Sequence, residues 1–374
     1  MRVCGYGAVS AYGWGVPHLL RGVSTGKSAA TPHHRTDLMT DGPVWLAEIP
    51  EPDEQVERRE SRYSRAVFAA VDEALQSARS TGWRPGPQVG MVLATSRGDV
   101  ELTRDLYLEE TNRSQSQRYV SALPSTLLVE LARRHSFSGI ACTVGAGCAG
   151  GLTAVHLARQ LLNTGSASDV VVIGVDVGTD PTTILSLAAL GPLKLGMSPD
   201  RACRPFSDDT QGFTFGEGAA ALVLSDGSAY GSINILATAA GNDHHHATSL
   251  NPDFSIMNAF VSSVLTSAAA SRNDVSTFIA HGSGTTQCNS VDRHVASWLP
   301  NLQQTIALKP LIGHCRAAAP LLEFIAFARM PEQNRDPSAF HVIGPLASTT
   351  PVTLQLALGF GGNLAVAVYE GRHV

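Results

Sequence analysis

Short apolar runs of strand length alternate along this chain with segments whose apolar residues recur at helical spacing, a pattern typical of α/β proteins. The runs at 170–174 and 219–224 contain no charged residue, as expected for strands that are covered on both faces. With 374 residues, 44% of them hydrophobic, the chain is long enough to bury such sheets in a large core. We therefore expect an α/β fold with internal sheets.

Reactive side-chain types collect where the expected strands end. Four such positions follow the segments 140–144, 277–280, 305–308 and 353–358, and they are Cys148, His281, Lys309 and the Gly-rich turn 359–362. Open α/β folds place their ligands and their chemistry at the ends of strands. These four positions are therefore candidates for one functional site.

Cys148 has the setting of a nucleophile. The sequence GAG precedes it and AGG follows it, which leaves room for an acyl group and for a tight turn. Apolar residues at helical spacing from 148 to 163 predict a helix that begins at the sulfur, and a helix N-terminus favours the thiolate. The alternative is a buried cysteine that acts as a small hydrophobic residue. The motif by itself leaves both interpretations open.

Two histidine motifs occur in the second half of the chain. His281 is followed by Gly-Ser-Gly-Thr, whose hydroxyls are able to bond an amide-bearing ligand. In KPLIGH, Lys309 and His314 lie close in sequence to Glu323, which is expected on a helix. These groups form either a charge network that keeps a histidine neutral and oriented or a structural ion pair between Lys309 and Glu323.

The Gly-rich turn GFGGN at 359–363 lacks the spacing of nucleotide-binding loops, and a strand-like segment follows it. Nucleotide binding is therefore disfavoured. The backbone N–H groups of the turn are suited instead to an oxyanion, with Phe360 as an apolar gate. The run of one aspartate and three histidines at 243–246 is a weak metal candidate, because adjacent side chains point in different directions. We expect no metal.

Charge and cysteine content exclude several classes of protein. The chain has 27 basic and 32 acidic residues, a net charge of −5 and no run of Lys or Arg, so we expect no nucleic-acid partner. The uncharged stretch 136–155 carries five glycines, so its hydropathy is too low for a membrane span. The six cysteines lack paired CxxC spacing. We expect a cytoplasmic protein with free thiols and no membrane contact.

In their order and spacing, these motifs resemble the β-ketoacyl synthase family, the condensing enzymes of fatty-acid and polyketide assembly. The resemblance covers nearly the whole chain: the opening RVCGYGAVSAYGWG, the cysteine motif, RPF, GF and GEGA between 204 and 219, HGSGT, KPLIGHCRAAA and the closing GFGGN. It implies a thiolase-like fold, with two similar βα halves in a five-layered αβαβα sandwich. The expected halves are 1–230, which carries the cysteine, and 231–374, which carries the two histidines and the Gly-rich loop.

The resemblance also implies roles for the motif residues. Cys148 matches the acyl-accepting nucleophile, and His281 and His314 complete a Cys-His-His triad. Lys309 and Glu323 match residues that tune the histidines and do not react themselves.

Two further groups of residues match by the same resemblance. Phe360, with Gly359 and Gly361 beside it, matches the oxyanion loop and the gate between acyl and malonyl binding. Ser283 and Thr285 match the hydroxyls that bond the amides of pantetheine.

The implied activity is formation of a Cys148 acyl thioester and its condensation with a malonyl thioester by decarboxylative Claisen chemistry. No cofactor is expected to be bound, because the substrates are carried on the phosphopantetheine of an acyl carrier protein. That carrier protein is the expected partner, together with a second copy of the chain in a homodimer or a ketosynthase-like subunit in a heterodimer.

Departures from the family pattern favour a specialised, polyketide-type pathway. Residues 149–151 are Ala-Gly-Gly where small hydroxylated residues are usual, and TQGF at 210–213 stands where RDGF is common. Both changes are expected to enlarge or neutralise the surroundings of the pocket. Two alternatives remain open: an acyltransferase of the same fold that makes no carbon–carbon bond, and a partner subunit that sets chain length. Since that subunit typically lacks the cysteine, the intact Cys148 argues against the second.

Overall fold

A computed structural model of the chain describes residues 1–38, 40, 42–52, 61–108, 115–227, 231, 233–330, 334, 340–342 and 352–371. In these residues the protein is a mixed α/β structure built on a 12-stranded sheet and a second, three-stranded one. The large sheet consists of two parts with the same pattern of strand directions.

The N-terminal part of the large sheet runs in the order β1 (Arg2–Ser10), β9 (Gly218–Ser225), β7 (Asp169–Asp176), β5 (Val89–Ala94) and β6 (Ala141–Val144). β9 is antiparallel to both β1 and β7, whereas β7, β5 and β6 are parallel to one another. The predicted apolar strands β7 and β9 are buried along their whole length.

The C-terminal part repeats this pattern with β10 (Ile233–Asn242), β15 (Asn363–Gly371), β14 (Val352–Gly359), β11 (Val275–Ile279) and β12 (Gln304–Ile306). β15 is antiparallel to β10 and β14, and β14, β11 and β12 are parallel. The short β13 (Phe340–Val342) pairs with β12 at the edge. A short pairing of Arg2 and Val3 with Asn234 and Ile233 joins the two parts.

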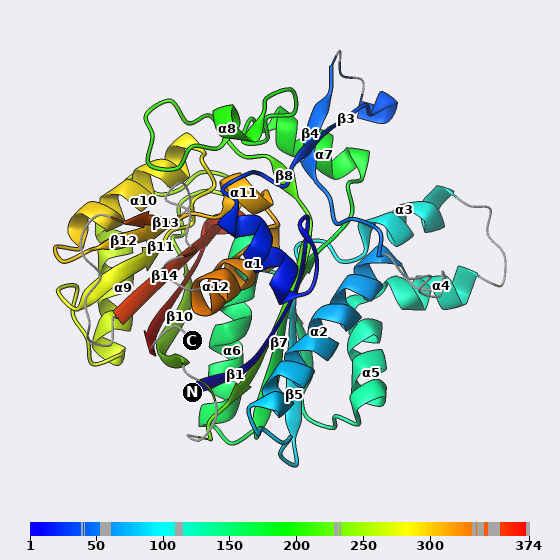
Figure 1. Cartoon of the computed structure of the whole chain (residues 1–374), viewed down its shortest axis with the longest axis vertical. Coiled ribbons are helices and arrows are strands. Elements are labelled where there is room, and N and C mark those ends of the chain that lie inside the picture. The colour runs from blue at the N-terminus through cyan, green and yellow to red at the C-terminus, as the bar shows by residue number, and fades with distance from the viewer. Residues whose placement is uncertain are drawn as a thin grey trace.

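Helices form three layers around the two parts of the sheet (Figure 1). α1 (Val16–Ser24), α6 (Gly150–Asn163) and α12 (Ala319–Arg329) share one hydrophobic core with strands of both parts. α2 (Arg62–Ser80) and α5 (Pro124–His135) cover the outer face of the N-terminal part. α9 (Phe254–Ser267) and α10 (Thr286–Trp298) cover the C-terminal part. The result is the five-layered αβαβα sandwich that the resemblance implied.

The central layer explains the composition of α12. Residues 319–328 of this helix are all buried, because sheets lie on both sides of it, and small or apolar side chains satisfy that environment. Glu323 is the charged exception, at 1% exposure. A carboxyl group in this position needs a partner inside the protein.

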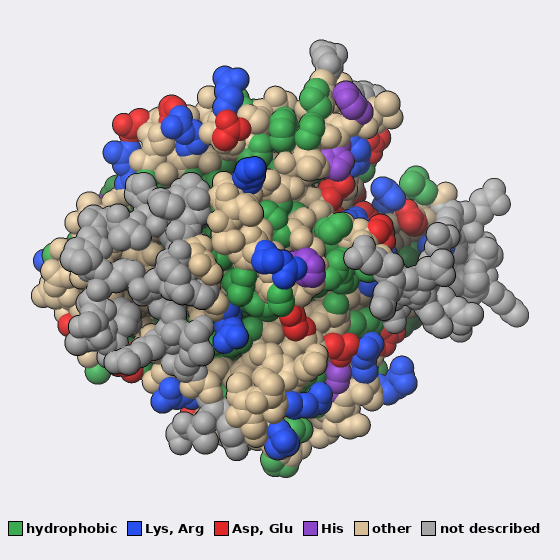
Figure 2. All heavy atoms as spheres, viewed as in Figure 1, with side chains coloured by type: hydrophobic (Ala, Val, Ile, Leu, Met, Phe, Trp, Pro, Cys, Tyr) green, Lys and Arg blue, Asp and Glu red, His purple; other side chains and the backbone are tan. Residues whose placement is uncertain are grey.

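The remaining helices and strands are short. They are β2 (Gly13–Trp14), β3 (Thr31–His33), β4 (Val44–Ala47), β8 (Phe215–Gly216), α3 (Val100–Leu108), α4 (Gln115–Ala122), α7 (Pro181–Ala189), α8 (Pro199–Ala202) and α11 (Lys309–Ile312). Among the described residues, no helix is both long and apolar enough to cross a membrane. On the face shown in Figure 2, basic and acidic side chains of the described residues are interspersed.

Candidate active site

Cys148 lies on a tight turn between β6 and α6, as the sequence predicted. The turn is a single 3-10 segment, Gly147–Ala149, and α6 begins at Gly150. Gly147 has a φ of 52°, a left-handed conformation that glycine adopts without steric cost. The glycine before the nucleophile is therefore required by the backbone.

The space beside Gly151, at the start of α6, is filled by protein backbone. A Cβ atom at this position would lie 2.7 Å from the carbonyl oxygen of Ala317. The absence of a side chain thus lets the nucleophile's helix approach the segment that follows His314. At Gly151 this differs from the expectation that the changes at 149–151 enlarge or neutralise the surroundings of the pocket, because residues 317–321 of the same chain occupy the freed volume.

His281 is held at the end of β11 by its own backbone and by a neighbouring strand. The backbone N–H groups of His281 and Gly282 donate to the two carboxylate oxygens of Asp292, at 3.0 and 2.8 Å. The Leu358 N–H of β14 donates to His281 Nδ1 at 3.3 Å. Since Nδ1 is an acceptor, a neutral His281 carries its proton on Nε2.

His314 follows α11 and lies beside the first histidine. Its backbone N–H donates to the Thr214 carbonyl at 2.8 Å, and the ring of Phe213 packs edge-on against its ring at 4.7 Å between centroids. The His281 and His314 rings are 5.6 Å apart and nearly perpendicular. His314 Nδ1 is buried and has no hydrogen-bond partner among the described residues, a state expected where a ligand completes a site.

Lys309 and Glu323 form a buried ion pair behind the histidines. Lys309 Nζ is 2.7 Å from Glu323 Oε1 and also donates a hydrogen bond to the His281 carbonyl. Burial raises the pKa of Glu323 to about 7, against the opposing effect of Lys309. Burial, and then the charge of Lys309, lower the pKa of His281 and of His314 well below the usual 6.5. Both imidazoles are therefore neutral at pH 7.

The Gly-rich loop after β14 packs directly on the cysteine turn. A Cβ at Gly359 would lie 2.7 Å from the Ala146 carbonyl oxygen, and one at Gly147 would lie 3.7 Å from the backbone nitrogen of Phe360. The Gly361 N–H is already used, because it donates to the Ala247 carbonyl at 2.7 Å. The Phe360 side chain is 41% exposed.

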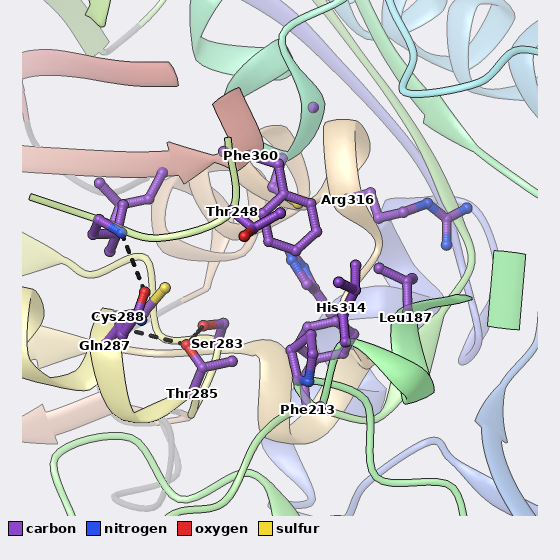
Figure 3. A pocket seen from close by; sticks show the side chains of 18 of the residues that line it. Leu187, Phe213, Thr248, Ser283, Thr285, Gln287, Cys288, His314, Arg316 and Phe360 are labelled. Carbon is purple, nitrogen blue, oxygen red and sulfur yellow. Dashed lines mark hydrogen bonds between the residues drawn. The ribbon is translucent and has the colours of Figure 1, made fainter. Parts of the chain in front are cut away.

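One cavity of about 710 Å³ connects these groups, and its lining includes Cys148, His281, His314, Ser283, Thr285, Gly359, Phe360 and Gly361. Ser283 Oγ and Thr285 Oγ1 are 3.3 Å apart, and both hydroxyls lie on one side of His314 in Figure 3. Lys309 and Glu323 lie outside this lining. Lys309 contacts the site through the His281 carbonyl, and Glu323 contacts Lys309. The structure thus brings together every predicted site residue, eight in the cavity wall and two behind it.

The acidity of Cys148 differs from what the sequence suggested. Burial raises the pKa of the Cys148 thiol to about 12, and the charge of Lys309 acts in the opposite direction. The predicted helix N-terminus is present, because α6 begins at Gly150, and burial acts on the pKa of the thiol in the opposite direction. With the pKa raised in this way, the Cys148 thiol must lose its proton when it reacts as a nucleophile.

Models of two protein domains match the chain. "Beta-ketoacyl synthase, N-terminal domain" matches residues 3–229, and "Beta-ketoacyl synthase, C-terminal domain" matches residues 232–342. The chain belongs to the β-ketoacyl synthase family. The two models meet close to the junction of β9 and β10, where one part of the large sheet gives way to the other.

Two relatives in the family cover most of the chain. The ketoacyl synthase alpha subunit of the tetracenomycin polyketide synthase from Streptomyces glaucescens is 27% identical over 83% of this chain and 82% of its own length. A malonyl-ACP decarboxylase of polyketide biosynthesis from Bacillus subtilis is 25% identical over 98% of this chain and 95% of its own.

Solved structures in the family share the fold over the whole chain. A type II polyketide ketosynthase, solved with its acyl-carrier protein and bound to a hexaketide, matches with a TM-score of 0.82 at 23% identity and 99% coverage of both chains. The ishigamide ketosynthase/chain length factor matches with a TM-score of 0.80 at 20% identity, covering 99% of this chain and 98% of that one.

Sequence reasoning missed part of the cavity wall. Arg316, Phe213 and Leu187 line the cavity in this family member (Figure 3), as do Ser96, Arg97, Thr183, Gln287 and Cys288. The signal for Arg316 was present, since it is a charged residue inside the apolar segment 311–322. The other residues come from loops and helices that are distant in sequence, and no local pattern identifies them.

The histidines at 244–246 have a structural setting in the loop before α9. Asp243 accepts hydrogen bonds from the backbone N–H groups of His245 and Asn251, at 3.2 and 3.0 Å, and its own N–H donates to Gly362. This segment therefore supports the Gly-rich loop of the cavity.

Proposed function

We propose that the chain is a β-ketoacyl-(acyl carrier protein) synthase that forms an acyl thioester on Cys148 and extends it by decarboxylative Claisen condensation. The observation that carries this proposal is one cavity whose lining brings the Cys148 thiol together with the neutral imidazoles of His281 and His314. The relatives named for polyketide biosynthesis support a specialised pathway of that kind.

In the first step, the Cys148 sulfur attacks the thioester carbonyl of an acyl group on the carrier's phosphopantetheine. The new bond joins Cys148 Sγ to the acyl carbon, and the bond from that carbon to the pantetheine sulfur breaks. The leaving pantetheine thiolate takes up the proton that the Cys148 thiol releases. This covalent intermediate divides one difficult acyl transfer into two easier steps.

In the second step, a malonyl thioester loses its carboxylate as carbon dioxide, and the bonding electron pair stays on the α-carbon as an enolate. His281 has its proton on Nε2, because Leu358 occupies Nδ1, so its ring donates to the enolate oxygen, with neutral His314 beside it. Donors placed where charge develops stabilise the transition state most in a site shielded from water. Protonated histidines are not needed for this role.

The enolate carbon then attacks the Cys148 thioester carbonyl, and the collapse of the resulting oxyanion expels the Cys148 thiolate, which takes a proton from solvent to restore the thiol. The backbone N–H groups of Cys148 and Phe360 are the proposed donors to that oxyanion. The close packing of Gly147 on the Phe360 nitrogen supports this assignment. No bound cofactor takes part, because the carrier's phosphopantetheine presents both substrates, and Ser283 and Thr285 are its proposed amide partners.

An acyl carrier protein is accordingly the proposed partner, and a second copy or a related subunit is proposed at the edge of the large sheet. β6 is the last strand of the N-terminal part, and Ala141 and Thr143 are exposed on it. Among the described strands, β6 pairs on one side only, with β5, and an open edge with small exposed residues is suited to pairing with another chain. Sedimentation of the protein and of Ala141→Lys tests this, with loss of the larger species expected in the variant.

The proposed location is the cytoplasm. All six cysteines are free thiols, which fits a reducing compartment.

The test of the proposed reaction is intact-mass analysis after incubation with acyl-carrier and malonyl-carrier thioesters. The protein and Cys148→Ala are compared in the same run, and the carrier products are weighed with them. We expect an acyl adduct on the protein that Cys148→Ala lacks, together with a carrier product extended by two carbons and release of carbon dioxide.

The other outcomes identify the alternatives. An acyl adduct without consumption of malonyl thioester would favour an acyltransferase that makes no carbon–carbon bond. If no acyl group of any length is loaded, the chain is instead a subunit that serves a catalytic partner.

A further inference from the structure

We divide the residues that line the cavity into two groups, a hydroxyl arm and an arginine arm. The hydroxyl arm is lined by Thr248, Ser283, Thr285, Gln287 and Cys288, and the arginine arm is lined by Ser96, Arg97, Thr183, Leu187 and Arg316. Figure 3 shows Leu187 and Arg316 on one side of His314, with Ser283, Thr285 and Cys288 on the other. The proposed function uses the hydroxyl arm for pantetheine and leaves the arginine arm without a role.

Arg316 is a buried cation with two nitrogens, Nε and Nη1, for which the described residues supply no hydrogen-bond acceptor. It is 8% exposed, and within the described part of the chain both atoms are buried without a hydrogen-bond partner. A guanidinium has five N–H donors in a rigid plane, and a buried donor that lacks an acceptor destabilises the protein by about 1–3 kcal/mol. Such an arrangement is stable only where something else supplies the acceptor.

The neighbouring carboxylate does not supply it. Asp176 Oδ2 is 3.6 Å from Arg316 Nε, which is close enough for attraction but too long for a hydrogen bond. The oxygens of Asp176 are already occupied by the Ser96 hydroxyl and backbone N–H, the Thr95 hydroxyl and the Ala317 N–H. Asp176 therefore orients the arginine without satisfying its donors.

Two further features hold Arg316 in place. Its guanidinium carbon lies 4.3 Å from the centre of the Phe215 ring, a stacking contact that favours a fixed plane. Its backbone has a φ of 47°, a left-handed conformation that strains a non-glycine residue and persists mainly at functional sites. A side chain fixed in this way is preorganised for a ligand and is not free to move into solvent.

We propose that Arg316 binds a carboxylate on the far end of the acyl group carried by Cys148, so that the arginine arm selects half-thioesters of dicarboxylic acids over neutral acyl groups. This inference rests on the proposed function, because it assumes an acyl group on Cys148. The planar fork of the guanidinium matches the two oxygens of a carboxylate. An alkyl chain in the same place would leave the donors of Arg316 unpaired.

The surroundings of Arg316 also fit an anion. Arg97 lines the same arm and donates a hydrogen bond to the Thr183 hydroxyl. A second positive charge and several hydroxyls are favourable for a carboxylate and add no benefit for a saturated hydrocarbon chain. Leu187, which shares the arm, is suited to the methylene carbons that would join the carboxylate to the thioester.

The test compares loading rates of matched acyl groups on carrier protein by intact mass. Succinyl, glutaryl and adipoyl thioesters are each paired with the neutral acyl group of the same carbon number. At the favoured length, we expect the dicarboxylic group to load at least about tenfold faster, as one charge-assisted hydrogen bond predicts. Arg316→Met and Arg316→Gln should bring the ratio close to one, and Arg134→Met, which removes an exposed cation paired with Asp72, should not change it.

A second readout does not depend on enzymatic activity. Alkylation of Cys148 by 6-maleimidohexanoate is compared with alkylation by the corresponding amide, with peptide mapping to confirm the labelled cysteine. We expect the acid to react faster than the amide in the natural protein and at an equal rate in Arg316→Gln.

The two readouts separate the two proposals. Equal ratios in the natural protein and both Arg316 variants would overturn the carboxylate site while leaving the synthase reaction intact. Failure of every carrier thioester to load, with an Arg316-dependent maleimide ratio, would instead overturn the proposed function and retain the anion site.

Discussion

Lys309 and Arg316 are two buried cations of the same motif, and they differ in whether the fold supplies their hydrogen-bond partners. Lys309 is 1% exposed and is bonded to the Glu323 carboxylate and the His281 carbonyl. Arg316 is 8% exposed, and two of its nitrogens have no acceptor among the residues that the structure describes. A buried charge is tolerated when its partners are internal. The comparison therefore supports the proposed roles of Lys309 as a positioning residue and of Arg316 as a ligand-binding residue.

The difference follows from where the two residues lie in the fold. Lys309 begins α11 and faces α12, whose buried residues are apolar except for one carboxylate, Glu323. Arg316 lies beyond the histidine on the next turn, where it faces the cavity and a carboxylate that already has its hydrogen bonds. Lys309, whose ammonium group is paired inside the protein, is thus only seven positions from Arg316, whose guanidinium has donors that the described residues leave unpaired.

The largest expected effect is on folding stability at Lys309. Lys309→Met leaves Glu323 buried without its partner, so we expect the free energy of unfolding to fall by about 3–5 kcal/mol. Arg316→Met should change it by about 1 kcal/mol or less, because it removes unpaired donors together with a stacking contact. Urea denaturation measures both. The double variant Lys309→Met/Glu323→Leu should recover most of the loss, and equal losses in the two single variants would abolish the distinction.

The next effect is a pH dependence of the free energy of unfolding that comes from Glu323, the partner of Lys309. The pKa of Glu323 is raised from 4.5 to about 7, so its contribution to stability is full below pH 4.5 and is lost as the pH rises toward 7. Relative to Glu323→Gln, the natural protein should lose about 2–3 kcal/mol over this interval, as a shift of this size implies.

The two histidines and Asp292 also titrate below neutrality. The pKa of Asp292 is raised to about 6, and those of His281 and His314 are lowered, so their effects oppose one another. These groups are common to both proteins and cancel in the comparison. Parallel stability curves for the natural protein and Glu323→Gln would contradict the assigned role of Glu323.

A smaller effect is expected where α6 packs on the Arg316 segment. Gly151→Ala places a Cβ 2.7 Å from the Ala317 carbonyl, so we expect destabilisation by about 1–3 kcal/mol from overpacking and a reduced preference for dicarboxylic thioesters. The matched control is Gly145→Ala, since a Cβ there meets no atom within 4 Å. Unfolding curves and loading ratios are measured together, and similar values for the two variants would show that the contact is loose.

The smallest expected effect is that of Asp176 on anion binding by Arg316. Asp176→Asn removes a negative charge 3.6 Å from Arg316 Nε, so the field of the arginine is less cancelled. We expect the ratio of acid to amide in the maleimide reaction to rise about two- to fivefold, a change of less than about 1 kcal/mol. A lower ratio would mean that Asp176 is needed to hold the arginine in place.

The sequence was sufficient for the motifs and for the fold class. Apolar strands such as β7 and β9, the turn at Cys148 and the strand ends at His281 and Lys309 follow from local patterns, because strand burial and glycine turns leave local signatures. The roles of Cys148, His281 and His314 followed from the resemblance, and the structure places these residues in one cavity wall.

Three features were decided only by the tertiary structure. Burial raises the pKa of Cys148 although a helix begins directly after it, Ala317 fills the space beside Gly151, and Arg316 lies in the cavity wall with unused donors. Each depends on atoms that are distant in the chain, and desolvation and hydrogen-bond satisfaction are properties of the packed neighbourhood and not of a local pattern. The sequence alone thus determined which reactive groups the protein has. The packing of its layers decided the pKa values of these groups and which of their hydrogen-bond donors are left without an acceptor.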